Sequence, residues 1–129
     1  MATTQIKTLM AGTTFNNLVT AANSDALECG MCDAVAFWVN YDETEVGNSI
    51  SAAITLQMSF DAVTWFSASF YDYAGGSTLQ TTETLSADGN YYFWANKDLC
   101  APFYRVVVTA NNTDVDDLLV VKVKAAIRG

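Results

Sequence analysis

The sequence predicts an all-β fold, an antiparallel β-sandwich or jelly roll of about eight strands with an N-terminal arm. Apolar and polar residues alternate along much of the chain, and clusters of Gly, Asn, Asp and Ser separate the alternating runs. A length of 129 residues fits one domain. Hydrophobic residues make up 51% and charged residues 16% of the chain, which excludes disorder and predicts a surface poor in charge.

The clearest strand is residues 50–60, where the even positions are apolar and the odd positions are mostly Ser, Thr and Gln. Residues 35–41 alternate in the same way, and the acidic segment 42–49 lies between the two runs. We therefore expect these two runs to form an antiparallel pair. The other expected strands are residues 5–10, 65–73, 78–86, 91–94, 103–110 and 119–127.

The first thirty residues differ from the rest, and we expect residues 1–30 to be an arm with one strand and residues 31–129 to be the sandwich body. Within the arm, Phe15, Leu18, Val19 and Ala22 have helical spacing, which permits a short helical turn. The Thr and Asn residues between them equally permit an extended segment. An arm of this kind would become ordered on binding a partner.

Charge and composition exclude several classes of function. The net charge of −8 repels phosphate, so neither nucleic acid nor an anionic membrane is expected as a partner. No segment has the length and hydropathy of a transmembrane helix, and the opening residues do not resemble a signal peptide. We therefore expect the chain to fold in a cytoplasm, with its three cysteines reduced.

Two motifs could bind metals or react, but each has a simpler interpretation. Cys29 and Cys32 have redox spacing, yet they precede an antiparallel strand, and zinc would lack a histidine ligand because the chain has none. Acidic residues cluster in two expected loops without the spacing of a calcium-binding loop: Asp42, Glu43 and Glu45, then Asp114, Asp116 and Asp117. We expect no cofactor, no metal and no enzymatic activity, since no nucleophile has a visible base partner.

Aromatic residues mark the expected contact surface. Adjacent strand residues face opposite ways, so Tyr92 and Trp94 cannot share a face with Tyr91 and Phe93, and one pair must lie outside the core. Such residues can cover a neighbouring subunit or stack on sugars. The partner-binding candidates are Ile6, Leu9, Phe15, Leu18, Tyr92 and Trp94.

The segment Ser59-Phe-Asp-Ala-Val-Thr-Trp65 resembles a box found in β-propeller hydrolases, but it lacks the glycine and occurs once. The segment predicts a hairpin in which Asp61 accepts hydrogen bonds from backbone amides and Trp65 packs onto the core.

The strand pattern over about residues 30–129 resembles small β-sandwich virion proteins of tailed bacteriophages. The segments that carry the likeness are Phe37-Trp-Val-Asn-Tyr41, Gln57 to Trp65, Pro102 to Ala110, and the closing Leu-Val-Val-Lys-Val-Lys strand. The pattern is most similar to capsid decoration, or cement, proteins. The resemblance implies a homotrimer on the outside of a phage head that binds the major capsid protein and is assembled in the host cytoplasm. A tail, head–tail adaptor or baseplate component is the nearest alternative, and a carbohydrate-binding module is the next.

Overall fold

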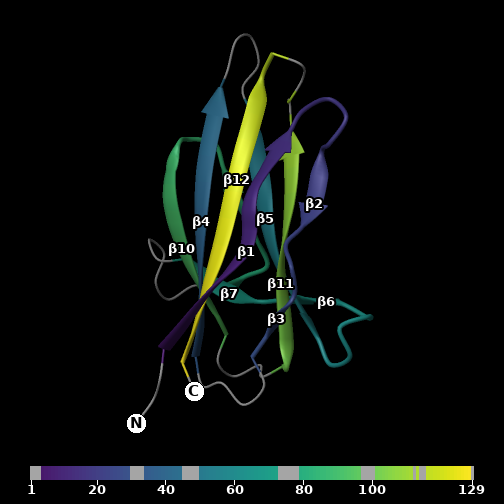
Figure 1. Ribbon diagram of the computed structural model, residues 1–129, viewed down its shortest axis with the longest axis vertical. Helices are drawn as coiled ribbons and strands as arrows, with labels where there is room; N and C mark the ends of the chain where they lie inside the picture. Colours follow the sequence, from purple (N-terminus) through teal and green to yellow (C-terminus); the bar gives the residue numbers. More distant parts are fainter. Residues whose placement is uncertain are drawn as a thin grey trace.

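A computed structural model describes residues 4–29, 34–44, 50–72, 79–96, 101–111, 113 and 116–128. These residues form two antiparallel sheets packed face to face, with no helix among them (Figure 1). The all-β sandwich expected from the alternation is therefore confirmed. The jelly-roll connectivity is not confirmed, and twelve strands replace the expected eight.

The first sheet has the strand order β1-β12-β4-β10-β7-β8. Its strands are β1 (Thr4–Phe15), β12 (Leu118–Arg128), β4 (Ala34–Thr44), β10 (Gly89–Ala95), β7 (Phe70–Asp72) and β8 (Leu79–Gln80). The second sheet has the order β2-β11-β5-β6, and β3 and β9 pair with β11 and β5. Its strands are β2 (Ala21–Asn23), β11 (Phe103–Asn111), β5 (Ser51–Ser59), β6 (Phe66–Ala68), β3 (Leu27–Glu28) and β9 (Thr82–Leu85).

The additional strands arise where the chain changes sheets. Residues 65–73, expected as one strand, divide into β6 in the second sheet and β7 in the first, with Ser69 at the corner. The amide of Asn96 donates to the carbonyl of Ser69 at 3.2 Å and holds this corner against the end of β10. Residues 78–86 divide in the same way into β8 and β9, and the remaining two strands, β2 and β3, come from the expected arm.

The expected pairing of residues 35–41 with residues 50–60 is wrong. β4 pairs with β10 and β12, whereas β5 pairs with β11, β6 and β9, so the two runs lie in opposite sheets. Alternation shows which side of a strand is buried, and that side is the same whether the next strand is a ladder neighbour or lies across the core.

The N-terminal segment is part of the sandwich rather than separate from it. β1 pairs with β12 along its whole length, and β2 and β3 pair with β11, so a boundary at residue 30 does not divide the described structure. The helical turn is not formed: Asn16 Oδ1 accepts the amide hydrogens of Leu18 and Val19 at 2.8 and 2.9 Å and turns the chain from β1 toward β2. Register shifts in β1 place Leu9 and Met10 both in the core, which broke the alternation in the sequence.

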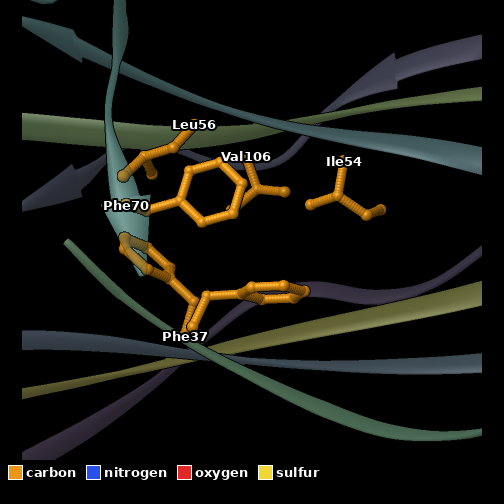
Figure 2. A pocket seen from close by; sticks show the side chains of 6 residues that line it. Phe37, Ile54, Leu56, Phe70 and Val106 are labelled. Carbon is orange, nitrogen blue, oxygen red and sulfur yellow. The ribbon is translucent and has the colours of Figure 1, made fainter. Parts of the chain in front are cut away.

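The core lies between the inner faces of the sheets. Phe70 packs edge-on against Phe93, with ring centroids 5.3 Å apart. A small void of about 10 Å³ is lined by Phe37, Phe70, Leu56, Val106 and Ile54, and Figure 2 shows these side chains gathered between the sheets. A void this small and apolar has the size of about one water and should stay dry, so both sheets are held together by close packing.

Candidate interaction surface

The six residues expected to bind a partner separate into two groups. Leu9 and Phe15 are 5% and 0% exposed and belong to the core, so they contact their own chain and offer no surface to a partner in this conformation. Ile6, Leu18, Tyr92 and Trp94 are 72%, 86%, 46% and 39% exposed. Phe93 between the two aromatics is buried, as the alternation predicted.

Three of the exposed residues lie together on the outer face of the first sheet. The strand register brings Ile6 opposite Ala126, Ala126 opposite Ala36, and Ala36 opposite Trp94. The same row continues through Tyr71 on β7 to Leu79 on β8. An apolar row therefore crosses all six strands. Leu18 is outside this group, because it lies in the turn between β1 and β2.

A second row runs beside the first and adds two aromatic rings and a positive charge. It consists of Thr8, Lys124, Trp38 and Tyr92, in register across β1, β12, β4 and β10. The ammonium of Lys124 lies 5.3 Å from the centroid of the Trp38 ring, a cation–π distance. We call the residues of the two rows the aromatic face.

The aromatic face contains a groove of about 250 Å³. The floor of the groove consists of Ala36 and Ala126, which are adjacent in the ladder and have short side chains. Its walls are the longer side chains of Ile6, Trp38, Tyr92 and Lys124. The sequence predicted Tyr92 and Trp94 on this surface. It did not predict the groove, which depends on the register of four strands, β1, β12, β4 and β10.

A second apolar surface lies at the tip of the hairpin between β5 and β6. Phe60, Val63 and Phe66 are 67%, 80% and 51% exposed there. The even-position pattern predicted Phe60 inward, but β5 ends at Ser59 and the chain turns before Phe60 could continue it. The hairpin predicted from the segment at residues 59–65 lies here, and it conflicts with the inward position that the alternation gave Phe60.

The turn itself follows the prediction for Asp61. Asp61 Oδ1 accepts hydrogen bonds from the amides of Val63 and Thr64 at 2.9 and 2.8 Å and from the hydroxyl of Ser59 at 3.0 Å. Hydrogen bonds from these groups lower the pKa of Asp61 below its usual value. The backbone amide of Thr64 contributes most, then that of Val63, then the Ser59 hydroxyl. Trp65 is half-buried, and the guanidinium of Arg105 lies 4.3 Å from its ring centroid.

The described cysteine, Cys29, and the described acidic residues of the two clusters belong to neither row of the aromatic face. The Cys29 thiol donates to the carbonyl of Ala101 at 3.1 Å, and Cys32 lies outside the described residues. Asp42 and Asp116 are exposed and Asp117 is buried, while Glu45 and Asp114 lie outside the described part. Among the residues that the structure describes, no three His, Cys, Asp or Glu side chains are grouped so as to hold a metal ion. A search of the same residues for a helix able to cross a membrane found none.

Comparisons with known proteins show similarity in fold. No protein-family model matches the chain, and no curated protein matches its sequence. The SPBc2 prophage-derived protein YomS has a similar structure, with a TM-score of 0.64 over 100% of this chain and 96% of that one, at 11% sequence identity. The structure of PirA aligns with a TM-score of 0.42 at 12% identity, covering 98% of this chain and 93% of that one. The likeness to YomS shows the sandwich fold, and the PirA alignment is too distant to support an argument.

Proposed function

We propose that this chain is a non-enzymatic structural protein of a phage virion, which binds the outside of the head and stabilises contacts between neighbouring major capsid proteins. The aromatic face is the observation that carries the proposal. A continuous apolar row that remains exposed across the outside of a sheet is typical of surfaces that a protein partner covers.

The end of the aromatic face toward β8 is the part we assign to the head. It holds Trp94, Tyr71 and Leu79, which lie in register on β10, β7 and β8. Large, rigid aromatic side chains bury much area at small entropic cost, and Trp and Tyr are enriched among the residues that dominate binding energies.

The comparison with known structures supports the phage assignment. YomS is described as prophage-derived, and its fold covers the full length of this chain. The strand pattern that resembles tailed-phage virion proteins lies on the same two sheets. A tail, adaptor or baseplate position would use the aromatic face in the same way, with a different neighbour beneath it.

The test is to find the chain in virions and to rebuild its contact. Mass spectrometry of gradient-purified virions, from the phage whose genome encodes the chain, should detect it in tens to hundreds of copies. Heads from a deletion mutant should bind the purified chain and then resist heat better than untreated heads. Absence from purified virions would overturn the proposal, and presence on separated tails alone would move the protein to a tail position.

Carbohydrate binding is the second candidate, because Trp38, Tyr92 and Trp94 share a face with a polar pair. Asn40 Nδ2 donates to Asn90 Oδ1 at 2.9 Å, one row beyond Trp38 and Tyr92. Amide groups beside aromatic rings can bind sugar hydroxyls while the rings stack. A glycan array on which the chain binds a defined sugar and Trp94→Ala does not would favour this function over capsid binding.

A further inference from the structure

The molecule carries an apolar projection and an apolar depression at separate places. The projection is the tip of the β5–β6 hairpin, with Phe60, Val63 and Phe66 exposed, which we call the knob. The depression is the alanine-floored groove on the aromatic face. The β5–β6 hairpin that bears the knob belongs to the second sheet (Figure 1), and the groove opens on the outside of the first, so the two cannot meet within one chain.

We propose that the knob of one copy inserts into the groove of a second copy, so that the chain self-associates head to tail. The inference concerns the isolated chain and holds whether or not the chain binds a phage head.

The size of the groove supports a protein side chain as its occupant. Small-molecule sites measure roughly 300–1,000 Å³, and the groove, at about 250 Å³, is smaller. A volume of this order accommodates one or two side chains such as Phe60 and Val63. The floor residues Ala36 and Ala126 have short side chains, so an inserted ring would contact the walls formed by Ile6, Trp38 and Tyr92.

The rigidity of the knob supports the same occupant. The hydroxyl oxygen of Ser59 accepts the amides of Asp61 and Ala62 at 3.2 and 2.9 Å, and Asp61 accepts those of Val63 and Thr64. These bonds fix the tip before binding, which reduces the entropic cost of inserting it. Ala62 has a φ of 62°, a left-handed conformation that costs about 1 kcal/mol or more for a residue other than glycine. Strain of this kind is typical of segments whose shape serves a function.

Charge complementarity favours a second copy over an unrelated apolar partner. The knob carries one acidic group, Asp61, between its exposed apolar residues, and its hydrogen bonds favour the charged form. Lys124 lines the groove, and Lys122 lies two residues earlier on the same face. An otherwise acidic chain with a net charge of −8 thus places lysines where an acidic knob would dock.

Head-to-tail contacts between identical chains close into rings or continue as open chains. A ring of three copies would give the homotrimer implied by the family resemblance. Because the knob has only two aromatic side chains, each burying about 150–250 Å², one contact is small and we expect micromolar affinity. A closed ring would be tighter, because each copy then makes two contacts.

Sedimentation velocity from 1 to 200 µM tests the proposal with two variants. Phe60→Ser with Val63→Ser removes the knob, and Ala36→Leu with Ala126→Leu fills the groove; both change outward-facing residues, and circular dichroism checks that each variant folds. We expect concentration-dependent assembly of the wild type and monomers of each variant. Mixed together, the two variants should form a 1:1 dimer at least tenfold tighter than either self-association, because one intact knob meets one intact groove.

Thr84→Ser on the outside of the second sheet is the matched control and should assemble like the wild type. Three results would overturn the proposal: a wild type that stays monomeric at 200 µM, a knob variant that assembles normally, or mixed variants that stay apart. A monomeric wild type that still binds heads would leave the proposed function standing. A wild type that assembles but is missing from virions would support self-association and overturn the proposed function.

Discussion

The outer faces of the two sheets differ although their inner faces are alike. Both inner faces are lined by buried Val, Leu and Ile. On the outside, the first sheet presents Trp, Tyr, Ile and Leu, whereas the second presents mainly short polar side chains. The residues of the second outer face include Ser51, Thr55, Gln57, Ser67, Thr82, Thr84 and Thr109.

This difference separates what folding requires from what a partner requires. The second sheet is completed with an outer face that is mainly Ser, Thr and Gln and also holds Arg105 and Val107, so a continuous aromatic row is not needed to form a sheet of this sandwich. The composition of the aromatic row on the first sheet is typical of surfaces that contact a protein, which is why we propose that role for it.

The largest expected effect comes from the shared interior. Phe70→Ala removes a fully buried ring from the contact with Phe93 and should lower the free energy of unfolding by about 3–5 kcal/mol. Urea denaturation monitored by tryptophan fluorescence measures this free energy of unfolding. Thr84→Ala on the second outer face should change the free energy of unfolding by about 0.5 kcal/mol or less. A Phe70→Ala loss as small as that of the control would show that the sheets are not held by this packing.

The next effect compares the two outer faces in binding. Trp94→Ser should weaken binding of the purified chain to heads by about 30-fold, or about 2 kcal/mol, because an exposed interface tryptophan is a typical centre of binding energy. Titration of fluorescently labelled chain onto heads gives the affinity. Thr84→Ser should bind within about twofold of the wild type, and equal losses for the two variants would contradict a special role for the aromatic face.

A smaller effect is expected at the hairpin of the second sheet. The lowered pKa of Asp61 means that its carboxylate stabilises the folded state above the ordinary carboxyl pKa, and that this contribution is lost as pH falls through the lowered value. Asp61→Ala should therefore melt at a lower temperature than the wild type at pH 7. The gap should narrow as the solution is acidified toward pH 2. A gap that is constant with pH would mean that the carboxylate charge is not involved.

The smallest effect concerns two carboxylates at the side where the sheets meet. Burial, followed by repulsion from Asp72 on the first sheet, raises the pKa of Glu83 on the second. The folded protein therefore holds this proton more tightly than the unfolded chain, and its stability decreases as pH rises through the raised value. Glu83→Gln should melt slightly higher than the wild type at pH 8 and the same at pH 4. A lower melting temperature at pH 8 would contradict the repulsion.

Local pattern predicted much of this structure because burial in a strand depends on neighbours two residues apart. The alternation over residues 50–56 and around Phe93 correctly separated buried from exposed side chains. The turn at Asp61 was predictable for a similar reason, since its hydrogen bonds reach only three residues along the chain.

Features set by distant parts of the chain could not be predicted in this way. The corner at Ser69 depends on Asn96, and the groove depends on the register of Ala36 against Ala126. Leu9 and Phe15 read as exposed arm residues because the irregular register of β1 hid its alternation. In each case the missing information was which strand lies beside which.

The position of β12 has a consequence for how the chain is made. β12 lies between β1 and β4 in the first sheet, yet it is the last of the twelve strands to be synthesised. While the chain is still on the ribosome, β1 and β4 have no strand between them, and their edges are open to pairing with other chains. The second sheet, whose β11 is already complete, can form earlier. All described strands of the second, polar-faced sheet are therefore synthesised before the strand that completes the sheet bearing the aromatic face.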